Sequence, residues 1–160
     1  MLIDTKLQIL ASTPDLLEDL LSEIPESLLK ERRIEGKWSI HEHAVHLPEA
    51  QGMINERFRR FKEEQNPVFK PYLPGDTVSD DYLIDVELNI ALEKFRKGRI
   101  EMITILKSYS STEWKNEGSH PEYVKINPLL WVRHVMMHDH FHMYRIEELW
   151  LTNDTYLRKA

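Results

Sequence analysis

The sequence contains no cysteine among its 160 residues. This absence excludes a disulfide framework, a thiolate metal ligand and a cysteine nucleophile, so a metal site would have to use His, Asp or Glu. No apolar run approaches the ~20 residues that a membrane-spanning helix needs. The N-terminus also lacks the layout of a signal peptide. We therefore expect a cytoplasmic protein that does not bind membranes.

Positive charge is also in deficit. Lys and Arg together number 21 against 27 Asp and Glu, which gives a formal net charge of −6. Because nucleic-acid affinity depends on clustered Lys and Arg, we expect no nucleic-acid partner. The apolar fraction of 41% and the charged fraction of 30% are typical of globular proteins. A chain of this length predicts a single domain, residues 1–160, with a core of its own.

Helical periodicity dominates the chain, and no convincing strand pattern or internal repeat accompanies it. Residues with strong N-cap preference precede several of the apolar stripes. The long connections favour at least one crossover along the bundle. We therefore predict an all-α four-helix bundle. Its expected helices cover residues 13–24, 40–64, 79–107 and 127–150, after a short N-terminal helical segment at 2–11, with caps at Thr13, Ser39 (with Glu42), Ser79 and Asn127.

Four features interrupt this helical pattern. Pro48 lies inside the second predicted helix, where it removes one hydrogen bond, so we expect a kink or a break there. Gly98 lies inside the third helix and allows a neighbouring helix to come close. Residues 66–79 are rich in Pro and predict a surface linker, whereas residues 108–126 are polar and predict irregular structure.

The main chemical signal is histidine. His138 and His142 are four residues apart on the face of the last helix that should point into the core, a spacing that suits two imidazoles on one metal. The pair alone is more typical of two histidines at the surface or at the edge of a core than of a metal site. Buried without a ligand, however, both rings would need hydrogen-bond partners, and a shared cation would satisfy both. His43 and His46 lie on the apolar side of the second helix, and the residues alone leave both open as a third ligand.

The remaining histidines receive other interpretations. His140 should face solvent, and His41 lies off the apolar stripe. His120 falls in a predicted loop, where we expect it to be solvated, near the rim of the site at most. His134 is one turn before His138. We assign it a packing role, or contact with a metal ligand rather than with the metal itself.

Three charged residues are candidates for supporting roles. Arg145 and Arg57 lie near the histidines on their helices, and an inward Arg could hold a substrate carboxylate with two hydrogen bonds. The alternative for Arg145 is an ion pair at the end of the bundle with Glu147 or another acid. Asp139 lies off the predicted metal face, but its carboxylate could still orient an imidazole.

Two segments resemble a known family. Residues 36–47, GKWSIHEHAVHL, and residues 138–142, HDHFH, resemble the two conserved segments of the DinB-like (DinB/YfiT-like) metalloprotein superfamily. The resemblance covers nearly the whole chain. It implies a four-helix bundle with up-down-down-up connectivity. It also implies a divalent metal, zinc or nickel, on His46, His138 and His142. Pro48 and the additional histidines depart from the usual pattern.

The resemblance also carries expectations about function. Members of the family often form homodimers, and some resemble thiol S-transferases that use bacillithiol or mycothiol, while others are described as metal-dependent hydrolases. We expect a metal-dependent transferase that acts on a small-molecule substrate with a low-molecular-weight thiol, because the chain has no cysteine to supply the sulfur. The alternatives are a hydrolase that uses a metal-activated water, and a non-catalytic metal- or ligand-binding bundle of the stress response.

Overall fold

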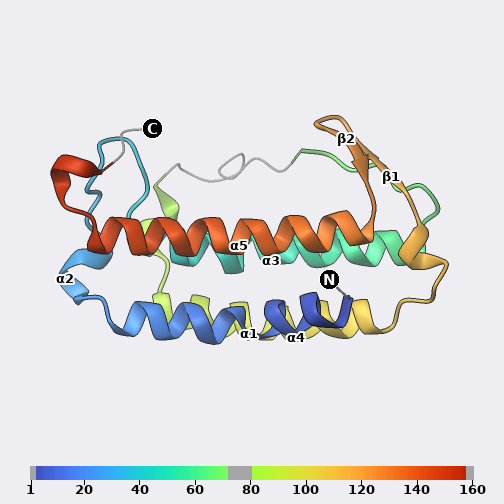
Figure 1. The fold of residues 1–160 in the computed structure, drawn as a ribbon, viewed down its shortest axis with the longest axis horizontal. Coiled ribbons are helices and arrows are strands. Elements are labelled where there is room, and N and C mark those ends of the chain that lie inside the picture. Colours follow the sequence, from blue (N-terminus) through green and yellow to red (C-terminus); the bar gives the residue numbers. More distant parts are fainter. Residues whose placement is uncertain (1–2, 72–80, 158–160) are drawn as a thin grey trace.

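Four long helices in two layers form the molecule (Figure 1). The structure is a computed structural model, and it describes residues 3–71 and 81–157. One layer contains α3 and α5, and the other contains α1 and α4. The predicted all-α four-helix bundle is therefore confirmed. The helices are α1 (Ile3–Ser22), α3 (Ile40–Glu63), α4 (Leu88–Lys107) and α5 (Pro128–Leu151), with shorter turns at α2 (Glu26–Leu29), η1 (Tyr82–Asp85), η2 (Glu113–Lys115) and η3 (Asp154–Tyr156).

The helix directions give the up-down-down-up connectivity that the resemblance implied. In Figure 1, α1 and α5 run from right to left, whereas α3 and α4 both run from left to right. Because α3 and α4 are parallel and consecutive, the connection between them has to return along the bundle, as the predicted crossover requires. Helix α3 packs against α4, α5 packs against α1, and within each layer the two helices pack closely enough that α3 contacts α5 and α1 contacts α4. Helices α4 and α5 lie diagonally across the bundle.

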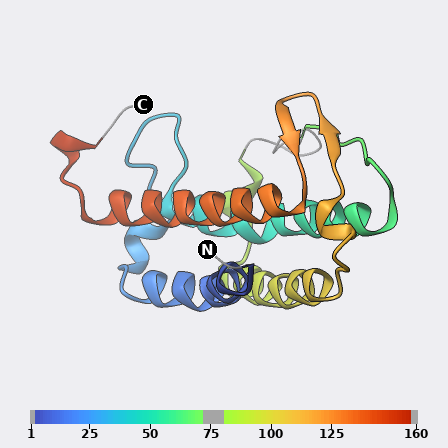
Figure 2. The ribbon, with the colours of Figure 1, turned by 45° about the vertical axis from the view of Figure 1, so that its right-hand side comes forward.

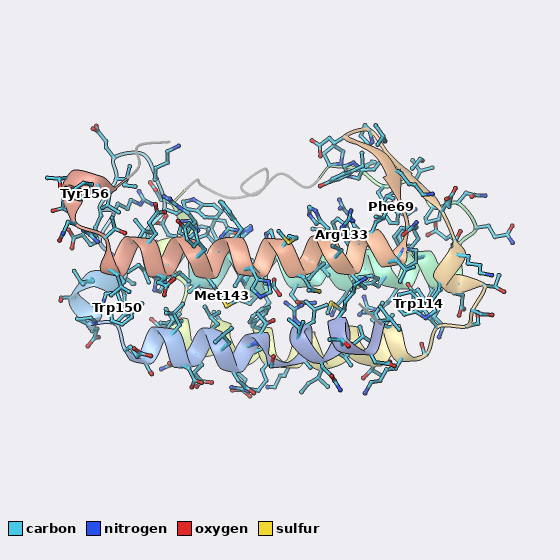
Figure 3. All side chains as sticks on the ribbon, viewed as in Figure 1. Phe69, Trp114, Arg133, Met143, Trp150 and Tyr156 are labelled. Atoms are coloured by element: carbon cyan, nitrogen blue, oxygen red, sulfur yellow. The ribbon has the colours of Figure 1, made fainter. Side chains whose placement is uncertain are left out.

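The apolar faces of the helices meet between the two layers. Figure 3 shows side chains filling this space, with Met143 of α5 among them. Phe58 and Phe95 are fully buried there, on α3 and α4 respectively. Among the helices that the structure describes, none is both long enough and apolar enough to cross a membrane.

The two helices that carry the predicted metal ligands begin where their caps predict. The Ser39 hydroxyl accepts a hydrogen bond from the backbone N–H of Glu42 at 3.2 Å, and the Glu42 carboxylate accepts one from the Ser39 N–H at 2.8 Å. This is a complete capping box at the start of α3. The Asn127 side chain likewise accepts from the Leu130 N–H at 2.9 Å, at the start of α5.

Two prolines lie inside continuous helices. The boundary predicted at Thr13 is wrong, because α1 passes through Pro14 and the Thr13 hydroxyl donates to the carbonyl of Ile9 at 3.1 Å. The short N-terminal segment and the first predicted helix are therefore one helix. A break at Pro48 is also wrong, since α3 continues through it. Each proline removes one backbone hydrogen bond, and burial on both sides of it holds the helix together.

The third long helix begins later than predicted. It starts at Leu88, after a 3₁₀ turn, and the expected cap at Ser79 lies outside the described residues. The turn packs its buried Leu83 with Val45 of α3 and Ala91 of α4. Val86 and the residue after it have extended backbones, so the turn does not join the helix. Residues 82–87 therefore lie outside the long helix that was predicted to include them.

Close contact between α3 and α4 explains Gly98. A Cβ atom at Gly98 would lie 2.7 Å from the Cγ atom of the buried Gln51 side chain. That distance is shorter than real Cβ contacts allow, so the close approach predicted for Gly98 is confirmed.

A short antiparallel hairpin corrects the prediction that residues 108–126 are irregular. Its strands are β1 (Gly118–His120) and β2 (Tyr123–Ile126). The hairpin stands over the layer formed by α3 and α5 (Figure 2). The chain after α3 joins it, with the Phe69 N–H donating to the Ser119 carbonyl at 2.8 Å. These segments bring His120 over the helices.

Candidate metal centre

Three histidines from two helices meet inside the α3–α5 layer. His46 is on α3, and His138 and His142 are one turn apart on α5. Each offers one ring nitrogen, and the three nitrogens lie within 4.8 Å of one another. The Nε2 atoms of His46 and His138 are 3.2 Å apart. The structure therefore brings together the three residues that the resemblance selects.

Burial keeps the imidazoles of His46 and His142 neutral. Only 4% of His46 and 5% of His142 is exposed. Desolvation, with smaller contributions from the neighbouring His138 and His43, lowers the pKa of His46 to about 3. Burial lowers the pKa of His142 as well, with smaller effects from the same cluster. A neutral imidazole has a free lone pair, which is the form that binds a metal.

The donor set fits a divalent metal. Two facing Nε2 atoms can share only one hydrogen, and the Nδ1 atoms of both His46 and His138 are buried without a hydrogen-bond partner among the described residues. Such unsatisfied polar atoms are costly. A cation between the rings would use the lone pairs that otherwise face each other. All-imidazole sites suit zinc and nickel.

His43 lies behind the cluster. Its Nδ1 atom is 2.9 Å from the Nδ1 atom of His142, which leaves the Nε2 atom of His142 for a metal. Burial, followed by the charge of Arg145, lowers the pKa of His43 to about 4. Metal-binding histidines commonly hold their second ring nitrogen in this way. The structure thus gives His46 and His43 different positions on α3, the first in the cluster and the second behind it.

A buried ion pair adjoins the cluster. Asp139 accepts a hydrogen bond from Arg99 of α4 at 2.7 Å, and the side chain of each is only 1% exposed. The other oxygen of Asp139 lies 3.8 Å from the Nδ1 atom of His138. Sequence reasoning missed Arg99. The available signal was its place between Phe95 and Met102 on the buried stripe of its helix.

Two of the other histidines differ from expectation. His41 is buried rather than off the core, because the turn containing Leu83 packs over it. His120 is also buried, in the hairpin that sequence periodicity did not predict. The remaining two agree with expectation. His140 is exposed, and His134 stacks on Trp131 with the ring planes 9° apart.

A cavity of about 230 Å³ lies beside the cluster. His46 and His138 form part of its wall, and Arg57 forms another part. The other lining residues come from α3, α5 and the hairpin. They are Ala50, Met53, Ile54, His120, Glu122, Tyr123, Trp131, His134 and Val135.

The two candidate arginines have different environments. Arg145 is ion-paired with Glu148 and lines a separate hollow that includes His43. This is the alternative that the sequence offered, with a different acid. Arg57 is buried and lines the same cavity as His46 and His138. Only Arg57 therefore shares a cavity with members of the histidine cluster.

The buried imidazoles predict acid sensitivity of the metal-free protein. Their pKa values in the folded state lie below the unfolded value of about 6.5, so the unfolded chain binds more protons below that pH. The free energy of unfolding should therefore decrease as the pH falls from 6.5 to 5, by about 2 kcal/mol for each of His43, His46 and His142. Urea unfolding at both pH values, with chelator present, measures this loss.

The matched variants are His43→Gln and His140→Gln. His43→Gln should reduce the pH dependence, because it removes one buried titrating group. His140→Gln should leave it unchanged, because His140 is exposed in the native state. A stability that is constant between the two pH values would contradict the neutral cluster.

Comparisons with known proteins agree with this fold. A DinB superfamily profile matches residues 9–146. The chain is similar to YfiT from Bacillus subtilis, described as a probable metal-dependent hydrolase with an unusual four-helix bundle topology. Identity is 20%, coverage is 91% of this chain and 84% of YfiT, and the TM-score is 0.82. TT2238, a four-helix bundle protein, is 19% identical, with 90% and 97% coverage and a TM-score of 0.66. No curated protein matches.

Proposed function

The chain belongs to the DinB superfamily, and on this premise we propose that it is an enzyme dependent on a divalent metal held by His46, His138 and His142. The reaction that we propose is transfer of a low-molecular-weight thiol to a small electrophilic substrate. The observation that carries the proposal is the position of His46 and His138 in a cavity wall. Three protein ligands beside an open space are the arrangement of catalytic zinc sites.

The chemistry needs an activated nucleophile. A divalent metal held by these histidines would lower the pKa of a water or a thiol that binds to it. In the transfer, the thiol loses its proton to solvent, the sulfur–carbon bond forms, and the leaving group departs with the electrons of its bond. Because the chain contains no cysteine, the sulfur has to come from a bound thiol.

The chain's own residues position the reactants. His43 fixes the ring of His142 from behind, at 2.9 Å. The hairpin contributes His120 and Tyr123 to the wall of the cavity. A wall that displaces water strengthens the electrostatic interactions inside a cavity.

Hydrolysis by an activated water is the second candidate. The description of YfiT as a probable metal-dependent hydrolase favours it. It would use the same histidines and the same cavity, with water in place of the thiol. A non-catalytic metal-binding bundle is less favoured, because two of the three histidines line a cavity instead of being enclosed on all sides.

Activity assays distinguish the two reactions. Zinc- and nickel-loaded protein is tested against panels of esters, amides and alkyl or aryl electrophiles, with and without added thiol. We expect turnover that requires the thiol and that falls to background in His138→Ala. The exposed His140→Ala variant is the matched control and should keep full activity. Turnover without thiol would establish the hydrolase, and full turnover by His138→Ala would contradict both candidates.

A further inference from the structure

Among the described residues, two arginines are buried, and only one of them forms an ion pair with a carboxylate. Arg99 is 1% exposed and is paired with Asp139 at 2.7 Å. Arg57 is 6% exposed and makes no ion pair with a carboxylate of the described chain. Buried charges in proteins are normally paired, because desolvation is costly. The cavity beside Arg57 is where a counter-charge could bind.

Neutral groups hold the guanidinium of Arg57 in place. Its Nη2 atom donates to the carbonyl oxygen of Lys70 at 2.7 Å, and its Cζ atom lies 4.6 Å from the ring centroid of Trp131. These contacts stabilise the cation without cancelling its charge. The N–H groups on Nε and Nη1 have no partner among the described residues, so they remain available to an anion.

His120 and Trp131 also line the cavity near Arg57. The Nδ1 atom of His120 accepts a hydrogen bond from the backbone N–H of Glu122 at 3.2 Å, so a neutral ring carries its hydrogen on Nε2. That Nε2 atom is 3.4 Å from the Nη2 atom of Arg57, and the ring also hydrogen-bonds the backbone carbonyl of Lys70. The indole N–H of Trp131 is buried without a described partner. The one acid in the described lining is Glu122, whose side chain is 57% exposed. Apart from this exposed acid, the described lining offers Arg57 no negative charge.

Arg57 and His46, which belongs to the histidine cluster, lie toward different ends of one face of α3. His46 and Arg57 are eleven residues apart, about three turns, so they share a face with Cα atoms about 16 Å apart along the helix. Ala50 and Ile54 lie between them and also line the cavity. The space thus has the imidazoles of His46 and His138 at one end, the guanidinium of Arg57 at the other, and apolar side chains between.

We propose that Arg57 forms a carboxylate-binding subsite, and that the substrate or the thiol is a small organic acid. Its carboxylate binds Arg57 while its reacting group lies beside His46 and His138. The placement of the reacting group beside His46 and His138 rests on the proposed function. A volume of about 230 Å³ restricts the ligand to a small molecule. Arg145 does not take this role, because Glu148 already neutralises it.

Binding of matched probes to zinc-loaded protein tests the subsite. The probes are 3-mercaptopropionate and its uncharged amide, 3-mercaptopropionamide, titrated by calorimetry. Hydrogen bonds between the Arg57 guanidinium and the carboxylate should make 3-mercaptopropionate bind about 10- to 100-fold more tightly than the amide. Arg57→Gln should lose this preference while its affinity for the amide stays the same. Arg57→Lys should keep part of it, and Arg145→Gln, the matched control, should keep all of it.

A second titration does not depend on the metal. Propionate is added to metal-free protein, and the indole N–H signal of Trp131, assigned with Trp131→Phe, is followed by NMR. We expect a saturable shift in the wild type and none in Arg57→Gln. If zinc fails to bind the wild type, the proposed function fails while this titration still decides the subsite. Equal binding of acid and amide, an unchanged preference in Arg57→Gln, or no propionate shift in the wild type would overturn the inference.

Discussion

Alanine in place of His142 is expected to abolish stoichiometric binding of zinc or nickel. The variant retains two of the three proposed ligands, whereas zinc sites in proteins use at least three. Substitution of a residue that only hydrogen-bonds a metal ligand typically lowers metal affinity by about 10- to 100-fold. Because His142 is itself a proposed ligand, we expect its loss to lower metal affinity by at least about 100-fold. His46→Ala and His138→Ala should behave alike. Metal analysis after purification without chelator or a metal-affinity tag, followed by zinc titration, measures the effect.

Two other histidines provide the controls for this experiment. His140→Ala should bind metal as the wild type does, because His140 is exposed. His43→Gln should be intermediate, about 10-fold weaker, because His43 contacts the Nδ1 atom of His142. Folded alanine variants that each still bind one zinc ion per chain with unchanged affinity would show that the assignment of ligands is wrong.

The second large effect is expected at the ion pair between Arg99 and Asp139. Replacing one member, as in Arg99→Met or Asp139→Asn, leaves the other without its partner in the centre of the bundle, where both are 1% exposed. Breaking a buried pair in this way costs about 3–5 kcal/mol of folding free energy. Urea unfolding of the metal-free variants at pH 7 measures the loss.

A double variant separates stability from metal binding. Arg99→Met/Asp139→Leu removes both charges, so its stability should return to within about 1–2 kcal/mol of the wild type. Its zinc affinity should still fall by about 10-fold, because the carboxylate 3.8 Å from the Nδ1 atom of His138 is gone. Single variants with wild-type stability would contradict the ion pair. A double variant with wild-type zinc affinity would show that the pair serves folding alone.

Local signals in the sequence predicted the helices that carry the site. The capping box of Ser39 and Glu42 and the cap at Asn127 form as expected, because they depend on residues three positions apart. The spacing of His138 and His142 places both on one helix face for the same reason. The boundary at Thr13 failed because Pro14 is tolerated inside a helix whose neighbouring residues are well buried.

Burial of individual polar residues could not be predicted in the same way. His41 is off the apolar stripe of its helix, and it is buried only because the turn containing Leu83 packs over it. His120 is buried because the hairpin folds onto the helices. A helical wheel describes one element and contains no information on which other segment covers each face. The same reason explains why Arg99, and its pairing with Asp139 from a diagonal helix, could not be predicted.

The sequence by itself determined the four-helix bundle, the starts of α3 and α5, and the helix face that His138 and His142 share, because helix caps and apolar periodicity are local properties of the chain. Only the tertiary structure decided how these residues meet. It placed His46 of α3 against the two histidines of α5, and His43 behind them. It also left Arg57 in the cavity while Arg145 paired with an acid. These outcomes depend on contacts between residues far apart in the chain.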